Sequence, residues 1–168
     1  MKTRQLTLTA LMSAIALVLS FIENRFVILP ACPGVKMGLS NVAVILALFF
    51  ISKKTAYGIA LIKALFSLAT RGVMAGVLSL SGGVASLTLV LLILAVSKNA
   101  SLSLIGVSGA LCHNLVQLFV ISFFYGGVSF LPYLPLLILS GVLFGVLNAA
   151  LLKAILPHFR KIIKSEKL

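Results

Sequence analysis

Long apolar stretches, interrupted only by short polar or Pro- and Gly-containing links, dominate this 168-residue sequence. Hydrophobic residues make up 61% of the chain, and charged residues make up only 10%, against about 25% in ordinary soluble domains. A water-soluble fold of this size would leave much of that apolar surface in contact with solvent. The sequence therefore predicts an all-α integral membrane protein, with room for about six helical spans of ~20 residues and for no separate soluble domain.

Six candidate spans can be placed along the chain. They cover approximately residues 6–22, 37–51, 55–70, 82–96, 102–125 and 133–156. The second, third and fourth are short for a hydrocarbon core of about 30 Å, which predicts tilt or local thinning of the bilayer. Residues 71–81 are rich in Gly and Ser and could form a short re-entrant or interfacial piece. Pro157 is expected to close the last span, which divides the chain into a six-helix transmembrane domain (1–157) and a basic cytoplasmic tail (158–168).

The distribution of cations predicts the orientation. The chain has 14 Lys and Arg residues and a formal net charge of +12. With the N-terminus inside, ten of the 14 lie on the cytoplasmic side, Lys63 lies within the third span, and Arg25, Lys36 and Arg71 lie outside. Because cytoplasmic loops carry an excess of Lys and Arg, both termini are expected in the cytoplasm, with the protein in the plasma membrane. We therefore interpret the positive net charge as a sign of membrane orientation and of contact with the anionic lipid bilayer, and not of nucleic-acid binding.

Acidic residues are nearly absent, and this excludes several functions. The chain contains only Glu23 and Glu166, whereas Mg²⁺ sites rely on carboxylates, commonly several together, and ion-coupled transport relies on carboxylates within the membrane. No segment matches the phosphate loop G-x-x-x-x-G-K-[ST]. The sequence predicts no enzyme, no ATPase, no metal and no cofactor; an enzyme using His113 is the weakest alternative, because a lone imidazole with no nearby acid is more often structural.

Polar side chains within the predicted spans are candidates for a ligand site, because polar groups are costly in hydrocarbon. Asn41 falls in the outer part of the second span. His113, Asn114 and Gln117 fall in the outer half of the fifth and share much of one helix face. Four hydrogen-bonding groups at similar depth predict an outward-opening pocket for a small molecule. The alternative is that they hydrogen-bond between helices as packing contacts.

Three further polar residues have more than one interpretation. Lys63 lies near mid-depth, and its stem either carries the ammonium toward cytoplasmic water or brings it to a ligand. Arg71, at the outer end of the same span, is better placed beside an outer pocket. With Arg25 and Lys36 it makes the outer mouth basic, which would suit an anionic substrate, although contact with lipid headgroups explains these cations nearly as well. Asn148 is expected to lie too deep for the pocket and to hydrogen-bond between helices.

Three segments of the sequence resemble a known family. Residues 33–41, read as PGVKMGLSN, resemble the P-G-x-K-x-G-L-[AS]-N segment of the Gx transporter family, also called heptaprenyl diphosphate synthase component I. Residues 109–117, read as GALCHNLVQ, resemble its G-A-x-x-H-N-x-x-Q segment, and residues 79–83 with Ser86 resemble its Gly/Ser-rich start of span four. The likeness covers nearly the whole chain. Lys63 falls where this family is expected to have arginine.

The family is similar to the substrate-binding (S) components of energy-coupling factor (ECF) transporters. The resemblance implies a six-helix subunit that binds a small nutrient, such as a vitamin, and associates with a membrane coupling subunit and two cytoplasmic ATPases. In S components an A-x-x-x-A face on the first helix contacts the coupling subunit. Ala10 and Ala14 match that face, although small residues four apart also serve ordinary packing within a bundle.

Two functional hypotheses follow. The first is a substrate-capture subunit of an ECF-type transporter, in which the polar site residues are Asn41, Lys63, Arg71, His113, Asn114 and Gln117. Its apolar walls are expected to include aromatic residues such as Phe66, Phe119 and Phe123. The second hypothesis takes the family's other name and makes the chain a noncatalytic membrane component associated with a soluble prenyl diphosphate synthase.

Overall fold

The computed structural model describes residues 2–25, 37–126 and 131–165, and within these ranges every regular element is helical. The elements are α1 (Lys2–Arg25), α2 (Leu39–Phe50), α3 (Lys53–Arg71), α4 (Val73–Val96), α5 (Leu102–Phe124), the short 3₁₀ turn η1 (Leu131–Tyr133) and α6 (Leu134–Ser165). The predicted all-α fold is therefore confirmed for the described residues.

Local sequence signals explain where several helices begin. The side chain of Ser52 accepts a hydrogen bond from the backbone N–H of Thr55 (3.1 Å), and Ser101 does the same for Leu104 (3.1 Å), so each serine caps the helix that follows it. Gly72 is the only residue between α3 and α4, with φ of 88°. Because L side chains rarely adopt that conformation, glycine permits this abrupt connection.

Four helices are long and apolar enough to cross a membrane: Thr3–Asn24, Val73–Val96, Leu102–Phe124 and Leu134–Phe159. The other two helices, α2 and α3, are not among these candidate spans, for different reasons. α2 has only 12 residues, and α3 carries Lys53, Lys54, Lys63 and Arg71. The chain is thus a multi-pass membrane protein by composition and helix length, while six crossings and cytoplasmic termini stay predictions.

Residues 71–81 do not form a separate re-entrant or interfacial piece. Except for Arg71 and Gly72 they belong to α4, which begins at Val73 and has 24 residues, so this span is not short. The Gly/Ser composition serves packing instead. A Cβ atom at Gly76 would lie 2.8 Å from Cβ of Leu68, which shows that glycine allows α4 to approach α3 closely.

Pro157 does not end the last helix. α6 continues through it to Ser165, and its apolar span reaches Phe159. The predicted division at residue 157 therefore falls inside a helix. The basic tail starts as a continuation of α6, and its last residues, 166–168, lie outside the described residues.

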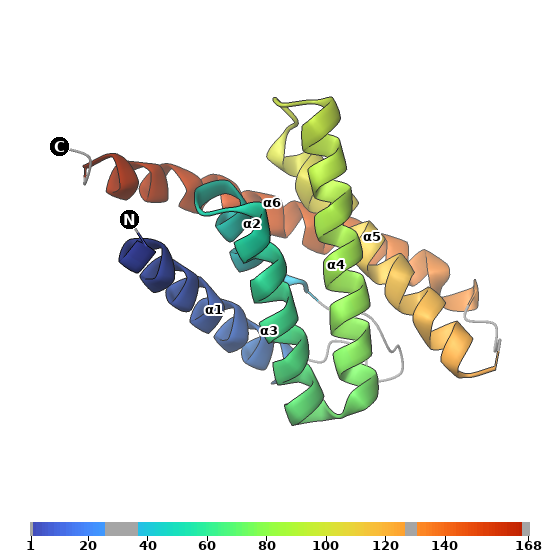
Figure 1. Cartoon of the computed structure of the whole chain (residues 1–168). Helices are drawn as coiled ribbons and strands as arrows, with labels where there is room; N and C mark the ends of the chain where they lie inside the picture. The colour runs from blue at the N-terminus through green and yellow to red at the C-terminus, as the bar shows by residue number, and fades with distance from the viewer. Residues whose placement is uncertain (1, 26–36, 127–130, 166–168) are drawn as a thin grey trace.

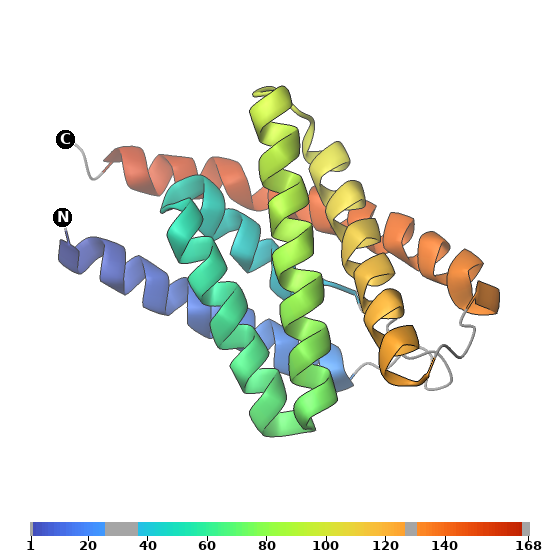
Figure 2. The ribbon, with the colours of Figure 1, turned by 45° about the vertical axis from the view of Figure 1, so that its right-hand side comes forward.

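The helices form two groups that meet along the centre of the bundle (Figures 1 and 2). α1, α2 and α3 pack on one another, and α4, α5 and α6 form a consecutive second group. Contacts between α3 and α4 and between α2 and α6 join the groups. α2 is the most enclosed helix, with Val42–Ala47 buried in the apolar core.

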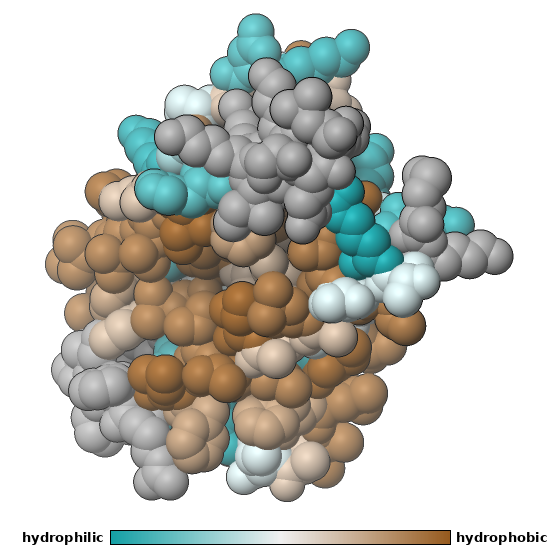
Figure 3. All heavy atoms as spheres, turned by 90° about the vertical axis from the view of Figure 1, so that its left-hand side faces the viewer, coloured by the Kyte–Doolittle hydropathy of each residue, from teal (hydrophilic) through white to brown (hydrophobic). Residues whose placement is uncertain are grey.

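The start of α1, the end of α6 and the turns that follow α2 and α4 lie toward the same end of the bundle (Figures 1 and 2). We call it the basic end because Lys53, Lys54 and Lys98 lie there. The turn at Gly72 and the end of α5 lie at the opposite end. On the face shown in Figure 3, hydrophobic residues cover most of the middle and hydrophilic residues gather near one edge. Large apolar side chains such as Phe123 and Leu139 are exposed on the surface, as expected for helices that face lipid.

Candidate ligand site

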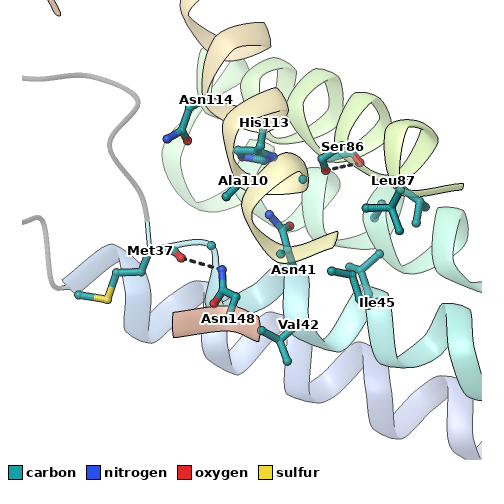
Figure 4. Close-up of a pocket in the computed structure, with 17 residues that line it drawn as sticks. Met37, Asn41, Val42, Ile45, Ser86, Leu87, Ala110, His113, Asn114 and Asn148 are labelled. Carbon is teal, nitrogen blue, oxygen red and sulfur yellow. Dashed lines mark hydrogen bonds between the residues drawn. The ribbon is translucent and has the colours of Figure 1, made fainter. Parts of the chain in front are cut away.

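An apolar chamber lies among five helices near the centre of the bundle (Figure 4). It encloses about 610 Å³ of space free of atoms, including the part that opens outward. Most of its lining is aliphatic or glycine, and its polar groups are few. The lining residues are Met37, Gly38, Asn41, Val42, Val44, Ile45, Ala60, Gly83, Ser86, Leu87, Val90, Gly106, Gly109, Ala110, His113, Asn114 and Asn148. Such a combination is typical of small-molecule sites.

The short length of α2 sets the depth of this chamber. Twelve residues extend only about 18 Å, so the first turn of α2 lies beside the middle of the longer helices rather than at their ends. Asn41 accordingly contacts Lys63, the eleventh of the nineteen residues of α3. His113 is the twelfth of the 23 residues of α5. The polar groups therefore meet near the middle of the bundle, and not in its outer half as predicted.

Two asparagines that line the chamber form hydrogen bonds between α6 and other parts of the bundle. Asn114 donates to the carbonyl of Leu137 (3.2 Å), and Asn148 donates to the carbonyl of Met37 (3.1 Å). The second bond is visible in Figure 4. Oδ1 of Asn148 is buried and accepts no hydrogen bond from the part of the chain that the structure describes. A buried acceptor in this state costs free energy.

Gln117 lies next to the chamber and holds His113, one of its lining residues. Its side chain is fully buried and does not line the chamber. The amide nitrogen donates to the carbonyl of Leu78 (3.1 Å) and to Nε2 of His113 (3.0 Å). Because Nε2 of His113 accepts this bond, the neutral imidazole carries its proton on Nδ1. Gln117 thus orients the His113 ring and ties α5 to α4.

A second, polar cavity adjoins the chamber, and we call it the charged recess. Its lining comes from α1, α3, α4, α5 and the start of α2. The lining residues are Ser20, Glu23, Asn24, Gly38, Ser40, Asn41, Lys63, Arg71, Ser79 and His113. Gly38, Asn41 and His113 line both cavities. The recess therefore meets the chamber at these three residues.

Glu23 holds the start of α2 in the recess. One of its carboxylate oxygens accepts the backbone N–H of Gly38, and the other accepts the hydroxyl of Ser40 (3.4 Å). Glu23 is 7% exposed. A carboxylate is favourable at this position because the free N–H groups and the dipole at a helix N-terminus attract negative charge.

Two cations of α3 share the recess with Glu23. Lys63 is 3% exposed, and its ammonium donates to Oδ1 of Asn41 and to the hydroxyl of Ser40 (3.3 Å). Arg71 is exposed at the end of α3, where its guanidinium donates to Oδ1 of Asn24 and to the hydroxyl of Ser67 (2.9 Å). Positions 63, 67 and 71 are four residues apart and share one helix face. The recess thus runs along α3 from its exposed end to its middle.

Comparison with known proteins assigns the chain to a family. The family model described as heptaprenyl diphosphate synthase component I matches residues 12–155. The chain belongs to this family. It is the Gx transporter family whose segments residues 33–41 and 109–117 resemble, so the predicted resemblance is confirmed. No curated protein and no solved structure gives a match.

Within this family member, the structure brings together three of the six predicted ligand residues around the chamber: Asn41, His113 and Asn114. Lys63 and Arg71 lie in the charged recess instead, and Lys63 reaches Asn41 rather than the basic end. The prediction that Asn148 lies too deep is wrong. It donates a hydrogen bond to the carbonyl of Met37, which precedes α2 and is not part of a helix, and it also lines the chamber, because the cavity lies deeper than predicted.

The predicted aromatic walls are also wrong. Phe119 and Phe123 are 74% and 76% exposed, and Phe66 does not line the chamber. Positions 119 and 123 lie on the face of α5 that points away from the core, where an aromatic side chain contacts lipid. The chamber walls are aliphatic instead, formed by residues such as Ile45, Leu87 and Val90.

Sequence reasoning missed Glu23 and Ser40. Glu23 directly follows the first predicted span and is the only acid before the C-terminal tail. An ionisable residue at the edge of an apolar segment is a functional-site hypothesis by default, and that signal was available. Ser40 carried no signal of its own beyond its place in the motif before Asn41.

The remaining predicted residues lie on the surface or outside the described residues. Ala10 and Ala14 are both exposed on α1, on the side opposite the buried Met12 and Ala16. Lys36 lies outside the described residues, and the side chain of Arg25 is not described. Across the ranges that the structure describes, no three His, Cys, Asp or Glu side chains gather as a metal site would require.

Proposed function

We propose that this protein is the substrate-binding membrane subunit of an ECF-type uptake transporter for a small nutrient or cofactor precursor. The observation that carries the proposal is the chamber, where Asn41, His113 and Asn114 meet among aliphatic walls at the centre of the bundle. Polar groups in a membrane bundle need a partner or a cavity. Their convergence on one mainly aliphatic cavity supports ligand binding over packing contacts alone.

Energy for transport must come from another protein under this proposal, because the sequence contains no phosphate loop. The subunit would bind its ligand and release it when the ATPases and the coupling subunit move the bundle. The charge distribution supports an orientation with the basic end in the cytoplasm. In that orientation the exposed Arg71 lies on the outer side and the charged recess opens outward.

Ligand-dependent thermal stabilisation of detergent-purified protein tests the binding role. A panel of vitamins and quinone precursors should contain at least one compound that raises the unfolding midpoint. Asn114→Ala and Asn41→Ala should abolish that shift, because each removes an amide from the chamber wall. Ser108→Ala is the matched control, since its hydroxyl bonds only to the carbonyl of Leu104 within α5. An undiminished shift in both asparagine variants would show that the ligand does not bind in the chamber.

Docking to the coupling subunit is assigned to α1. Ala10 and Ala14 are exposed there, and their small side chains permit close approach of another helix. Ala10→Leu with Ala14→Leu should reduce co-purification of the coupling subunit and ATPases at least about tenfold, while ligand stabilisation stays unchanged. Val84→Leu, at an exposed position on α4 and away from α1, is the control. Unaltered co-purification would assign the contact to another surface.

The family's description supports a second candidate function. In it, the chain is a noncatalytic membrane component of a heptaprenyl diphosphate synthase, and its basic end contacts a soluble subunit. Affinity purification from cells separates the two candidates. Recovery of ATPase subunits supports the transporter, and recovery of a prenyl diphosphate synthase supports the alternative.

A further inference from the structure

Positive charge exceeds negative charge in the recess. Lys63 and Arg71 both line it, and Glu23 is the only acid among its lining residues. The other acid in the sequence, Glu166, follows the last residue of α6 and lies outside the described residues. The buried carboxylate of Glu23 balances one of the two cations, and the excess positive charge lies toward the exposed end of the recess at Arg71. A recess with this excess attracts an anionic group.

The start of α2 adds to this positive field. α2 begins inside the bundle beside the recess, so its N-terminal dipole points into the protein and not into water. Helix N-termini placed within a membrane bundle attract anionic groups. Glu23 already uses the N–H of Gly38. The ammonium of Lys63 and the guanidinium of Arg71 bond to uncharged oxygens of Asn41, Ser40, Asn24 and Ser67, which an incoming anion can replace.

The chamber has the opposite character. Its lining includes no Lys, Arg, Asp or Glu, and its walls are mainly aliphatic. A charged group would lose its hydration there without compensation, whereas an uncharged apolar body would fit the aliphatic walls.

The two cavities adjoin each other. Gly38, Asn41 and His113 line both, and Asn41 accepts the bond from Lys63 in the recess while its own helix forms a wall of the chamber. A molecule that extends past Asn41 would therefore place one end in each cavity. The exposed end of the recess, at Arg71, is where the charged end would remain nearest to water.

We propose that the ligand is an anionic amphiphile, with an acidic head held by Lys63 and Arg71 in the recess and an uncharged, mainly apolar body in the chamber. This inference rests on the proposed function only in requiring that the cavities bind a small molecule. The shared chemistry is a carboxylate or phosphate joined to an apolar body, supplied either by a water-soluble acid or by an anionic lipid.

A matched pair of probes tests the charge requirement. Indole-3-propanoate and indole-3-propanamide have the same apolar body and the same N–H donor, and they differ in the charge of the head. Each is titrated into protein purified in an uncharged detergent at constant ionic strength, and the unfolding midpoint is measured. A separate arm adds phosphatidylglycerol or phosphatidylcholine, which tests the lipid source against an uncharged lipid control.

We expect the acid to stabilise the protein at a concentration at least about tenfold lower than the amide, since hydrogen bonds to a charged group are the stronger ones. Lys63→Gln should remove that preference, and Lys63→Arg should retain it. Arg71→Gln should weaken binding of the acid about threefold, because its site is exposed and screened. Lys54→Gln, which removes a charge from the other end of α3, should leave binding within about twofold.

Each possible result either supports or overturns an anionic head in the recess. Stabilisation by indole-3-propanoate or by phosphatidylglycerol that disappears in Lys63→Gln supports it, and the arm that responds identifies the source. Where Lys63→Gln does not fold, the loss in Arg71→Gln is the deciding measurement. Equal stabilisation by acid and amide, or no response in either arm, overturns the anionic head. The proposed transporter role is judged separately, by co-purification with ATPases.

Discussion

The charged recess and the apolar chamber share three residues and differ in nearly everything else. The recess is held by hydrogen bonds from α1 and α3 to the start of α2, and its stability depends on balancing a few charges. The chamber is enclosed by aliphatic side chains and by glycines where helices approach closely. Its form depends on packing.

A cavity inside a membrane bundle can therefore be formed by hydrogen-bonded polar groups or by the packing of apolar side chains. Polar groups are expensive in hydrocarbon and must be satisfied by specific partners, so a change in the recess leaves another group without its bond. Packing tolerates small changes when space is available and resists them when backbones touch. The substitutions that follow should therefore have different effects in the two regions.

The largest effect is expected in the recess, for Glu23→Ala. Removing this carboxylate leaves the N–H of Gly38 without its partner and leaves Lys63 and Arg71 without a counter-charge in the recess. The free energy of unfolding should fall by about 3–5 kcal/mol. Denaturant titration in detergent measures it. Glu23→Gln is the control, because its side-chain oxygen can still accept from Gly38. A wild-type stability of Glu23→Gln would show that the negative charge is dispensable, whereas equal losses for the two variants would show that the hydrogen bond to Gly38 contributes nothing beyond the charge.

A chamber wall provides the next test. α5 and α6 touch at Gly106 and Gly145, and a Cβ at Gly106 would lie 2.5 Å from the carbonyl oxygen of Gly145. Because backbone atoms cannot move aside easily, Gly106→Ala should cost about 2–3 kcal/mol of unfolding free energy. Gly58→Ala in α3 meets no atom within 4 Å and should be neutral or stabilising by up to about 1 kcal/mol. Equal stability of the two variants would mean that α5 and α6 are further apart.

Two adjacent glycines of α4, Gly82 and Gly83, differ in the space around them. A Cβ at Gly82 would lie 2.8 Å from Cε1 of His113, whereas one at Gly83 would lie 3.9 Å from Cβ of Ala60. Gly82→Ala should cost about 1–2 kcal/mol by displacing the imidazole, and Gly83→Ala should be neutral or slightly stabilising. Thermal unfolding of the two variants side by side checks this. The reverse order of stabilities would contradict the placement of His113.

The smallest effect is expected for Gln117→Leu. The change removes the bonds to Leu78 and His113, but it also removes a buried amide oxygen that has no hydrogen-bond partner among the described residues. The net loss should be about 1 kcal/mol. Ligand titration by thermal shift is the second measurement, and binding should weaken only modestly because Gln117 acts through His113. A variant that folds normally but loses all ligand binding would make Gln117 a direct contact.

Much of the fold was predictable because its cause is local. Long apolar runs specify helices in a membrane whatever their neighbours are, so the all-helical class and several of the boundaries could be placed. The errors occurred where composition was ambiguous. Residues 73–81 were separated from α4 because glycine and serine weaken an apolar signal, although the same residues allow close helix packing.

The candidate site was only partly predictable. Asn41, His113 and Asn114 could be proposed from polarity and helical spacing, and the chamber brings them together. Glu23 was missed, Asn148 was excluded, and Gln117 was placed at the ligand, because all three depended on depth and direction. Sequence spacing gives position along a helix but not the level at which two helices meet.

The helical class, the apolar character, the near absence of acids and the membership of the heptaprenyl diphosphate synthase component I family all follow from the amino-acid sequence. The packing of the helices sets the start of α2 in the middle of the bundle and divides the polar residues between a charged recess and an apolar chamber. Hydropathy acts on each segment independently, whereas the burial of Glu23 and Lys63 depends on which helices pack together and at what depth.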